Sequence, residues 1–209
     1  MNRILTHLLG IGFCALAHPA TGQKPNIIFI LTDDLGYGDV GVLFQKQREG
    51  VQVQTPELDE MAGAGTILNR HYCPAPICAP SRASLITGMH QGHTNVRNMQ
   101  FDKAIEDNWN FANTLKKAGY HTIHLGKYGL QGWGNSPEKW AGYPTKRGFD
   151  YFYGYVRHVD GHQHYPANFW KLGDNKSHQQ KKEVWENNDE VSAGLDKCYT
   201  CLLYTSPSP

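Results

Sequence analysis

The chain alternates between short continuous apolar runs and stretches with apolar positions at helical spacing. Apolar runs predict three strands, the first of them apolar on both faces as in a parallel sheet: 26–31, 66–72 and 120–125. Helical spacing, with glycines following each stretch, predicts three helices: 55–62, 81–87 and 110–118. Strands that alternate with helices indicate an α/β fold with a mainly parallel central sheet flanked by helices.

The N-terminus has the pattern of a targeting segment. Arg3 precedes an apolar run over residues 4–17 that ends on a small-x-small sequence, which is typical of a secretory signal peptide. We expect cleavage after Ala17, with Ala20 as the second choice. A membrane anchor is the alternative, but the run is shorter than the roughly 20 residues of a spanning helix, and no later run is long enough. The sequence therefore predicts a periplasmic or secreted protein without stable membrane insertion.

Composition narrows the class of protein. The 209 residues include 20 Lys and Arg against 19 Asp and Glu, which gives a net charge of +1. This balance does not favour nucleic-acid binding, which usually requires a basic excess. With 40% hydrophobic residues the chain is globular, and its length suits one large domain or two small ones.

Side chains that could bind a metal ion, bind an anion or act as a nucleophile follow each predicted strand. Asp33 and Asp34 come after the first, Cys78 and Arg82 after the second, and Lys127 after the third. In open parallel sheets, ligands bind beyond the carboxyl ends of the strands. Adjacent carboxylates suit a hard divalent cation, and a helix N-terminus beside cationic side chains suits a tetrahedral oxyanion. Together these features predict metal-assisted attack on a phosphate or sulfate ester.

The Cys78 segment carries the most specific motif. Its sequence, Cys78-Ala79-Pro80-Ser81-Arg82 continuing to Thr87-Gly88, resembles the signature of the type I sulfatases of the alkaline phosphatase-like superfamily. Residues 24–39 are similar to that family's opening strand and metal loop. Residues 120–127, which end at Lys127, resemble a third characteristic segment of the family. The resemblance covers roughly residues 24–170 in the correct order. We therefore expect residues 24–200 to be the N-terminal part of a sulfatase catalytic domain.

The resemblance implies a mechanism. A maturation enzyme would oxidise Cys78 to formylglycine, whose hydrate attacks the sulfur of a sulfate ester and then releases sulfate through its second hydroxyl. Asp33, Asp34 and the modified Cys78 would bind calcium. Arg82 would fix the formylglycine, and Lys127 would hold a sulfate oxygen. The implied substrate is a sulfated carbohydrate or an aryl sulfate.

One position departs from the family pattern. Many members have a histidine two residues after the lysine, whereas this chain has Gly129 two residues after Lys127. His162 and His164 are candidates to replace that histidine or to contact substrate. The alternative, that both are solvated side chains of a surface loop, stays open at this point.

The length of the family and the last nine residues bear on where the native sequence ends. The family is roughly twice this length, so the resemblance places its remaining calcium ligands and a second sulfate-binding lysine outside residues 24–200. Residues 201–209 resemble translated read-through of a sequencing adaptor, and we expect the native sequence to end near Thr200.

A zinc site of four cysteines (73, 78, 198 and 201) is disfavoured because the pairs lie far apart in the sequence. Cys73 is expected to have a structural role or to form half of a disulfide.

Two other functions remain as alternatives to the sulfatase. A phosphonate monoester or phosphodiester hydrolase of the same superfamily would share the nucleophile. An inactive carbohydrate-binding relic would keep the fold without the chemistry.

Overall fold

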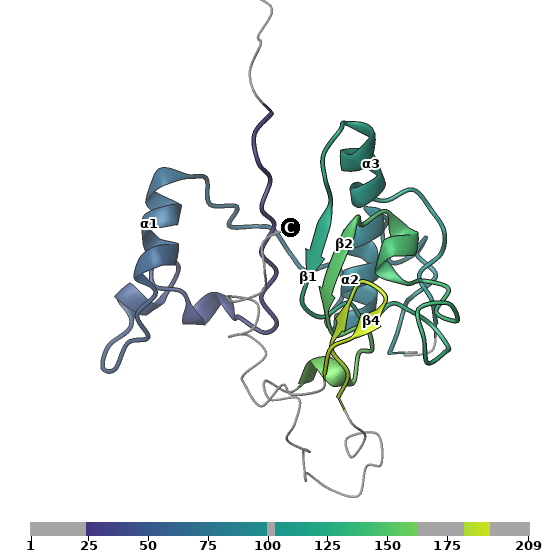
Figure 1. The fold of residues 1–209 in the computed structure, drawn as a ribbon. Helices are drawn as coiled ribbons and strands as arrows, with labels where there is room; N and C mark the ends of the chain where they lie inside the picture. Colours follow the sequence, from purple (N-terminus) through teal and green to yellow (C-terminus); the bar gives the residue numbers. More distant parts are fainter. Residues whose placement is uncertain (1–23, 100–102, 163–181, 193–209) are drawn as a thin grey trace, which may run out of the picture. The chain divides into compact units, whose positions relative to one another are not determined.

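A computed structural model of the chain describes residues 24–99, 103–162 and 182–192 (Figure 1). The predicted signal peptide, His164 and the predicted tail at 201–209 lie outside these residues. The chain divides into two compact units, residues 1–58 and 59–209. Among the described residues, no helix combines the length and the apolar character needed to cross a bilayer.

The first unit contains the short 3-10 helices η1 (Tyr37–Asp39) and η2 (Gln45–Gln47). Gln45 is buried and organises this unit, because its side chain donates to the carbonyl of Gly38 and accepts from the backbone N–H of Val53 at 2.9 Å. The strand predicted at 26–31 is not formed. A strand requires a hydrogen-bonded neighbour, and no strand is described in this unit to pair with it.

Helix α1 (Pro56–Ala64) begins at the predicted proline. In the second unit, α2 (Cys78–Thr87) starts three residues earlier than predicted and ends at Gly88, which has the expected left-handed backbone with φ 67°. Helix α3 (Phe111–Lys117) has Asn110 as its N-cap, whose side chain accepts a hydrogen bond from the third helical N–H. The strand predicted at 66–72 is wrong, since this segment forms turns and irregular backbone.

The second unit has a four-stranded sheet in the order β1-β2-β3-β4: β1 (Ile123–Leu125), β2 (Tyr151–Gly154), β3 (Trp185–Glu186) and β4 (Asp189–Glu190). β1 and β2 run parallel, whereas β2-β3 and β3-β4 are antiparallel. The α/β class is therefore confirmed, and the described sheet is mixed rather than mainly parallel. In Figure 1, β1 and β2 lie side by side, with α2 and α3 next to them.

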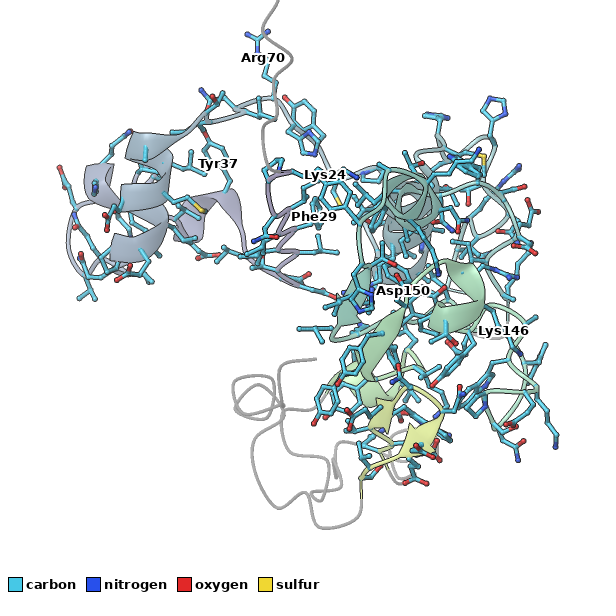
Figure 2. All side chains as sticks on the ribbon, turned by 45° about the horizontal axis from the view of Figure 1, so that its top comes forward. Lys24, Phe29, Tyr37, Arg70, Lys146 and Asp150 are labelled. Atoms are coloured by element: carbon cyan, nitrogen blue, oxygen red, sulfur yellow. The ribbon has the colours of Figure 1, made fainter. Side chains whose placement is uncertain are left out.

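An aromatic core holds this sheet and its helices together. Trp140 stacks on Tyr143, with ring centroids 5.7 Å apart, and Trp185 of β3 meets Trp140 edge-on at 5.2 Å. The η3 helix (Pro144–Arg147) follows, and the Lys146 amine, labelled in Figure 2, donates to three nearby carbonyls. Burial of these aromatic rings and their edge-on and stacked contacts stabilises this unit.

Candidate active site

Helix α2 carries Cys78 as its first residue, so the thiol lies at the N-terminal end of the helix. The apolar face of α2 fixes its position, because Ala79, Ala83 and Ile86 are almost completely buried in the core. The first turn is also tied down by Gln91, whose side-chain amide donates to the carbonyl of Pro80 at 2.8 Å. Cys78 is thus held at a rigid end of the helix and is itself only partly buried.

Arg82 lies one helical turn after Cys78 and connects α2 to the segment after β1. It is 8% exposed, and its Nη1 donates to the backbone carbonyl of Lys127 at 2.5 Å. Residues four apart lie on one face of a helix, so the guanidinium and the thiol face the same direction. The buried charge also acts on His124 of β1, whose pKa is lowered to about 4, first by burial and then by Arg82. His124 is therefore neutral at pH 7.

The segment after β1 reaches the site because it continues the parallel pairing. Gly126, Tyr128 and Gly129 donate backbone hydrogen bonds of 2.9 Å to carbonyls of residues 153, 155 and 156. Lys127 lies within this stretch and is partly buried. Its aliphatic stem packs against Gly161, where a Cβ atom would lie 2.6 Å from Lys127 Cδ. Glycine at 161 thus leaves room for the lysine side chain.

The 3-10 helix η4 (Asp160–His162) brings two imidazoles to Cys78. The Cys78 sulfur and ring nitrogens of His158 and His162 all lie within 4.8 Å of one another. The two rings meet edge-on with centroids 5.0 Å apart. His158 is buried, whereas His162 is exposed. His162 is thus placed beside the candidate nucleophile, and its role remains a prediction.

His158 was missed by the sequence reasoning. The spacing of His158 and His162, four residues apart, is the signal that could have indicated a pair acting together. The structure also places His158 against Gly129, the position that departs from the family pattern. A Cβ atom at Gly129 would lie 3.0 Å from His158 Nδ1, and the backbone φ of Gly129 is 75°. An imidazole from the loop after β2 therefore occupies the space that a side chain at position 129 would need.

A buried ion pair fixes the turn that carries these histidines. Asp160 has no exposed side-chain surface and accepts from Arg157 Nε at 2.8 Å and Nη2 at 3.1 Å. Glu183 lies 3.4 Å from the same guanidinium. Burial raises the pKa of Asp160 to about 6, against the opposing effect of Arg157. The pair holds η4 in place but is costly to desolvate.

Asp33 and Asp34 belong to the first unit, and both are exposed there. Adjacent carboxylates with accessible oxygens supply the hard ligands that calcium takes, so the donor chemistry of this pair fits a calcium ion. Cys73, the other described cysteine, is a free thiol whose sulfur lies 2.8 Å from Ser81 Oγ. Within the described part of the chain it forms no disulfide.

Comparisons with known proteins agree with this arrangement. The sulfatase family profile matches residues 25–200. The chain is 38% identical to arylsulfatase J of Mus musculus over 143 residues, which cover 66% of this chain and 22% of that protein. It is 33% identical to steryl-sulfatase of Homo sapiens over 148 residues, covering 66% of this chain and 24% of that protein. The chain thus spans about a quarter of the length of these relatives.

A solved structure supports the fold. The crystal structure of Ps i-CgsB is similar with a TM-score of 0.66 and 29% identity, over 88% of this chain and 40% of that chain. The family profile spans most of the chain, and the motif that it shares with the family lies at the start of α2. The chain therefore belongs to the sulfatase family.

Proposed function

We propose that the protein hydrolyses sulfate esters, with Cys78 as the precursor of the nucleophile. The observation that carries the proposal is that Cys78, Arg82 and the backbone of Lys127 lie together in the second unit. Arg82 donates to the Lys127 carbonyl from one turn beyond Cys78, so two separate elements contribute to one site. Family membership supports the reaction class.

Two groups would complete the site. Formylglycine at Cys78, once hydrated, would supply one hydroxyl for attack on sulfur and a second for the release of sulfate. Calcium would supply positive charge at the attacking oxygen and at the sulfate, with Asp33 and Asp34 as ligands together with the modified Cys78. Both groups follow from the family resemblance and from the donor chemistry of these residues.

The chain's own cations orient and stabilise the sulfate. Arg82 is nearly buried and held by its bond to the Lys127 carbonyl, so its guanidinium is fixed in position one helical turn after Cys78. Lys127 would donate to a sulfate oxygen and stabilise charge that develops in the transition state. His162, beside Cys78, and His164 would contact the substrate or the leaving oxygen.

The substrate class is a sulfated carbohydrate or an aryl sulfate. One solved neighbour was crystallised in complex with a neocarrahexaose, and curated relatives include an N-acetylgalactosamine-6-sulfatase of Mus musculus that is 34% identical over 165 residues. These relatives favour a sulfated sugar. The relatives named here do not favour the phosphonate hydrolase or the inactive relic.

The proposal includes a maturation partner and a location. A formylglycine-generating enzyme would act on Cys78 before the chain folds, because α2 buries Pro80 and Arg82 once it has packed. The apolar N-terminal run would direct the protein to the periplasm or the exterior.

Kinetics on paired model substrates test the reaction class. We expect the complete gene product, made together with the maturation enzyme, to cleave nitrophenyl sulfate more efficiently than nitrophenyl phosphonate esters. Cys78→Ala should abolish turnover, and Cys78→Ser should allow at most one slow turnover, since serine has no second hydroxyl to release sulfate. Cys73→Ala is the matched thiol control and should stay active. Higher efficiency on the phosphonate, or repeated turnover by Cys78→Ser, would contradict the proposal.

A further inference from the structure

Cys78, His158 and His162 bring one sulfur and two ring nitrogens together, and sulfate hydrolysis does not use the metal-binding chemistry of this set. Before any conversion, position 78 is a thiol, and it lies with two imidazole rings inside a 4.8 Å cluster. One sulfur and two nitrogen ligands are borderline-soft donors that suit zinc, whereas calcium prefers oxygen. The cluster therefore has a metal preference different from that of the Asp33-Asp34 pair.

We propose that the unconverted chain binds one zinc ion through Cys78, His158 and His162. Zinc–sulfur and zinc–nitrogen bonds are about 2.3 and about 2.0 Å long, so donor atoms around one ion lie roughly 3–4 Å apart. The three donor atoms lie within 4.8 Å of one another, and the exposed His162 is the ligand whose ring would move to close the cluster to that spacing. Water occupies the fourth position, as at zinc sites with three protein ligands. Binding converts the Cys78 thiol to a thiolate and releases its proton to solvent.

The surroundings of the cluster meet the requirements of such a site. The buried Asp160–Arg157 pair fixes the turn that carries both histidines, so two ligands are positioned before metal arrives. The buried core face of α2 fixes the third. The ion has a path from solvent, because His162 is exposed and Cys78 is partly exposed. Each of these features lies within the second unit.

The site exists only in one chemical form of the protein. An aldehyde hydrate offers hard oxygen in place of the soft sulfur, so conversion of Cys78 removes the ligand that selects zinc. The zinc site thus distinguishes unconverted from converted protein. It does not depend on the proposed hydrolysis, since it requires only the thiol and the two imidazoles.

Cobalt titration of the 209-residue chain, made in a host without the maturation enzyme, tests this site. We expect one Co²⁺ per chain, with thiolate charge-transfer absorption and tetrahedral d–d bands that one equivalent of Zn²⁺ abolishes. Cys78→Ser should lose the charge-transfer band. His158→Gln and His162→Gln should each weaken binding by more than about 100-fold, since even outer-shell partners contribute about 10–100-fold.

Two matched controls complete the experiment. Cys73→Ser removes the other described thiol and His93→Gln removes another exposed imidazole, and both variants should bind Co²⁺ as the parent does. Circular dichroism verifies the fold, and the exposed His162 provides a variant that does not disturb the core. No charge-transfer band in the parent, or a band that survives Cys78→Ser, would overturn the zinc site. Neither result bears on sulfate hydrolysis, which the nitrophenyl sulfate assay measures separately.

Discussion

At the scale of single residues, two glycines leave space for side chains of the candidate active site. Gly129 leaves space for His158, and Gly161 leaves space for the stem of Lys127. Neither close approach can be read from the sequence, because each depends on residues about 30 positions away that the sheet brings together. Cys78 and Arg82 could be predicted as a pair because they share one helical turn.

Gly161→Ala tests the close approach to Lys127. The added methyl group would lie 2.6 Å from Lys127 Cδ, so the flexible lysine must move away from its position. We expect a loss of kcat on nitrophenyl sulfate of at least about tenfold in the complete, converted protein, with unfolding free energy changed by less than about 1 kcal/mol.

Gly63→Ala is the matched control for Gly161→Ala. A Cβ atom at Gly63 meets nothing within 4 Å, and alanine is favoured inside α1. Urea unfolding should show it neutral or stabilised by about 0.5–1 kcal/mol, with kcat unchanged. Parental kcat in Gly161→Ala would show that Lys127 does not need its observed position.

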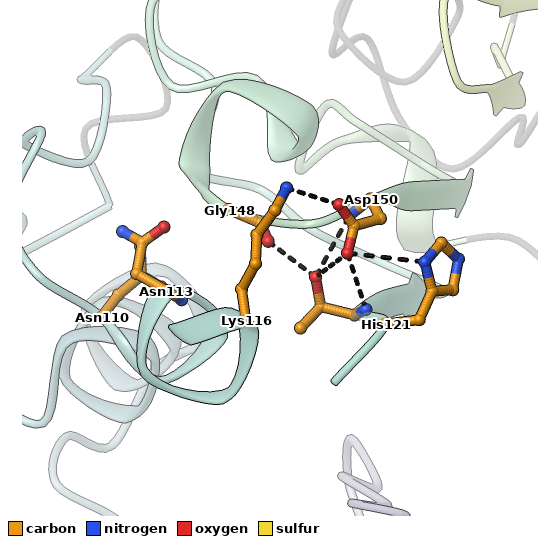
Figure 3. Close-up of polar contacts among 7 residues, drawn as sticks. Asn110, Asn113, Lys116, His121, Gly148 and Asp150 are labelled. Carbon is orange, nitrogen blue, oxygen red and sulfur yellow. Dashed lines mark hydrogen bonds and ion pairs between the residues drawn. The ribbon is translucent and has the colours of Figure 1, made fainter. Parts of the chain in front are cut away.

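At the scale of elements, the carboxylate of Asp150 joins α3, β1 and β2 (Figure 3). It pairs with the Lys116 amine of α3 and accepts from the backbone N–H of Thr122, just before β1, at 3.0 Å. The Lys116 hydrogen bond, followed by that of Thr122, lowers the pKa of Asp150 from 3.8 to about 2. Asp150 precedes β2 directly, so the contact sets where the parallel pair begins.

Asp150→Asn should therefore destabilise the protein by about 1–2 kcal/mol at pH 7, measured by urea unfolding. Because the folded pKa is lowered, this contribution is complete above pH 3.8 and is lost as the pH falls through about 2. The difference between parent and variant should shrink over that window. Asp107→Asn is the control, since Asp107 is 82% exposed in its pair with Arg147 and should cost less than about 0.5 kcal/mol. A difference that is constant from pH 5 to pH 2 would contradict the role of Asp150.

The elements also show what local sequence can predict. Helices α1, α2 and α3 follow from caps, apolar spacing and terminal glycines, and β1 follows from its apolar run. The strands at 26–31 and 66–72 were wrong because a strand is decided by its partner, which apolar character alone does not identify. The β3 and β4 strands have two residues each, which is too short for a recognisable alternation of apolar and polar residues, so the sequence did not predict them.

At the scale of the whole molecule, the chain corresponds to part of a sulfatase, and that part includes Cys78, the proposed precursor of the nucleophile. It spans 22% of arylsulfatase J and 40% of the Ps i-CgsB chain. The order of the predicted site residues along the sequence could be recognised before the structure. The proximity of His158 to Cys78 could not be recognised from the sequence, because it depends on how the loop after β2 folds onto α2.

Conversion of Cys78 is the central claim, and peptide mass spectrometry across residue 78 tests it most directly. The chain should be made with and without a formylglycine-generating enzyme, and the peptide that contains the exposed Cys73 serves as the internal thiol control. We predict that only the co-expressed protein carries an aldehyde at residue 78, while Cys73 keeps its sulfur in both preparations. An active protein whose residue 78 still carries sulfur would contradict the account.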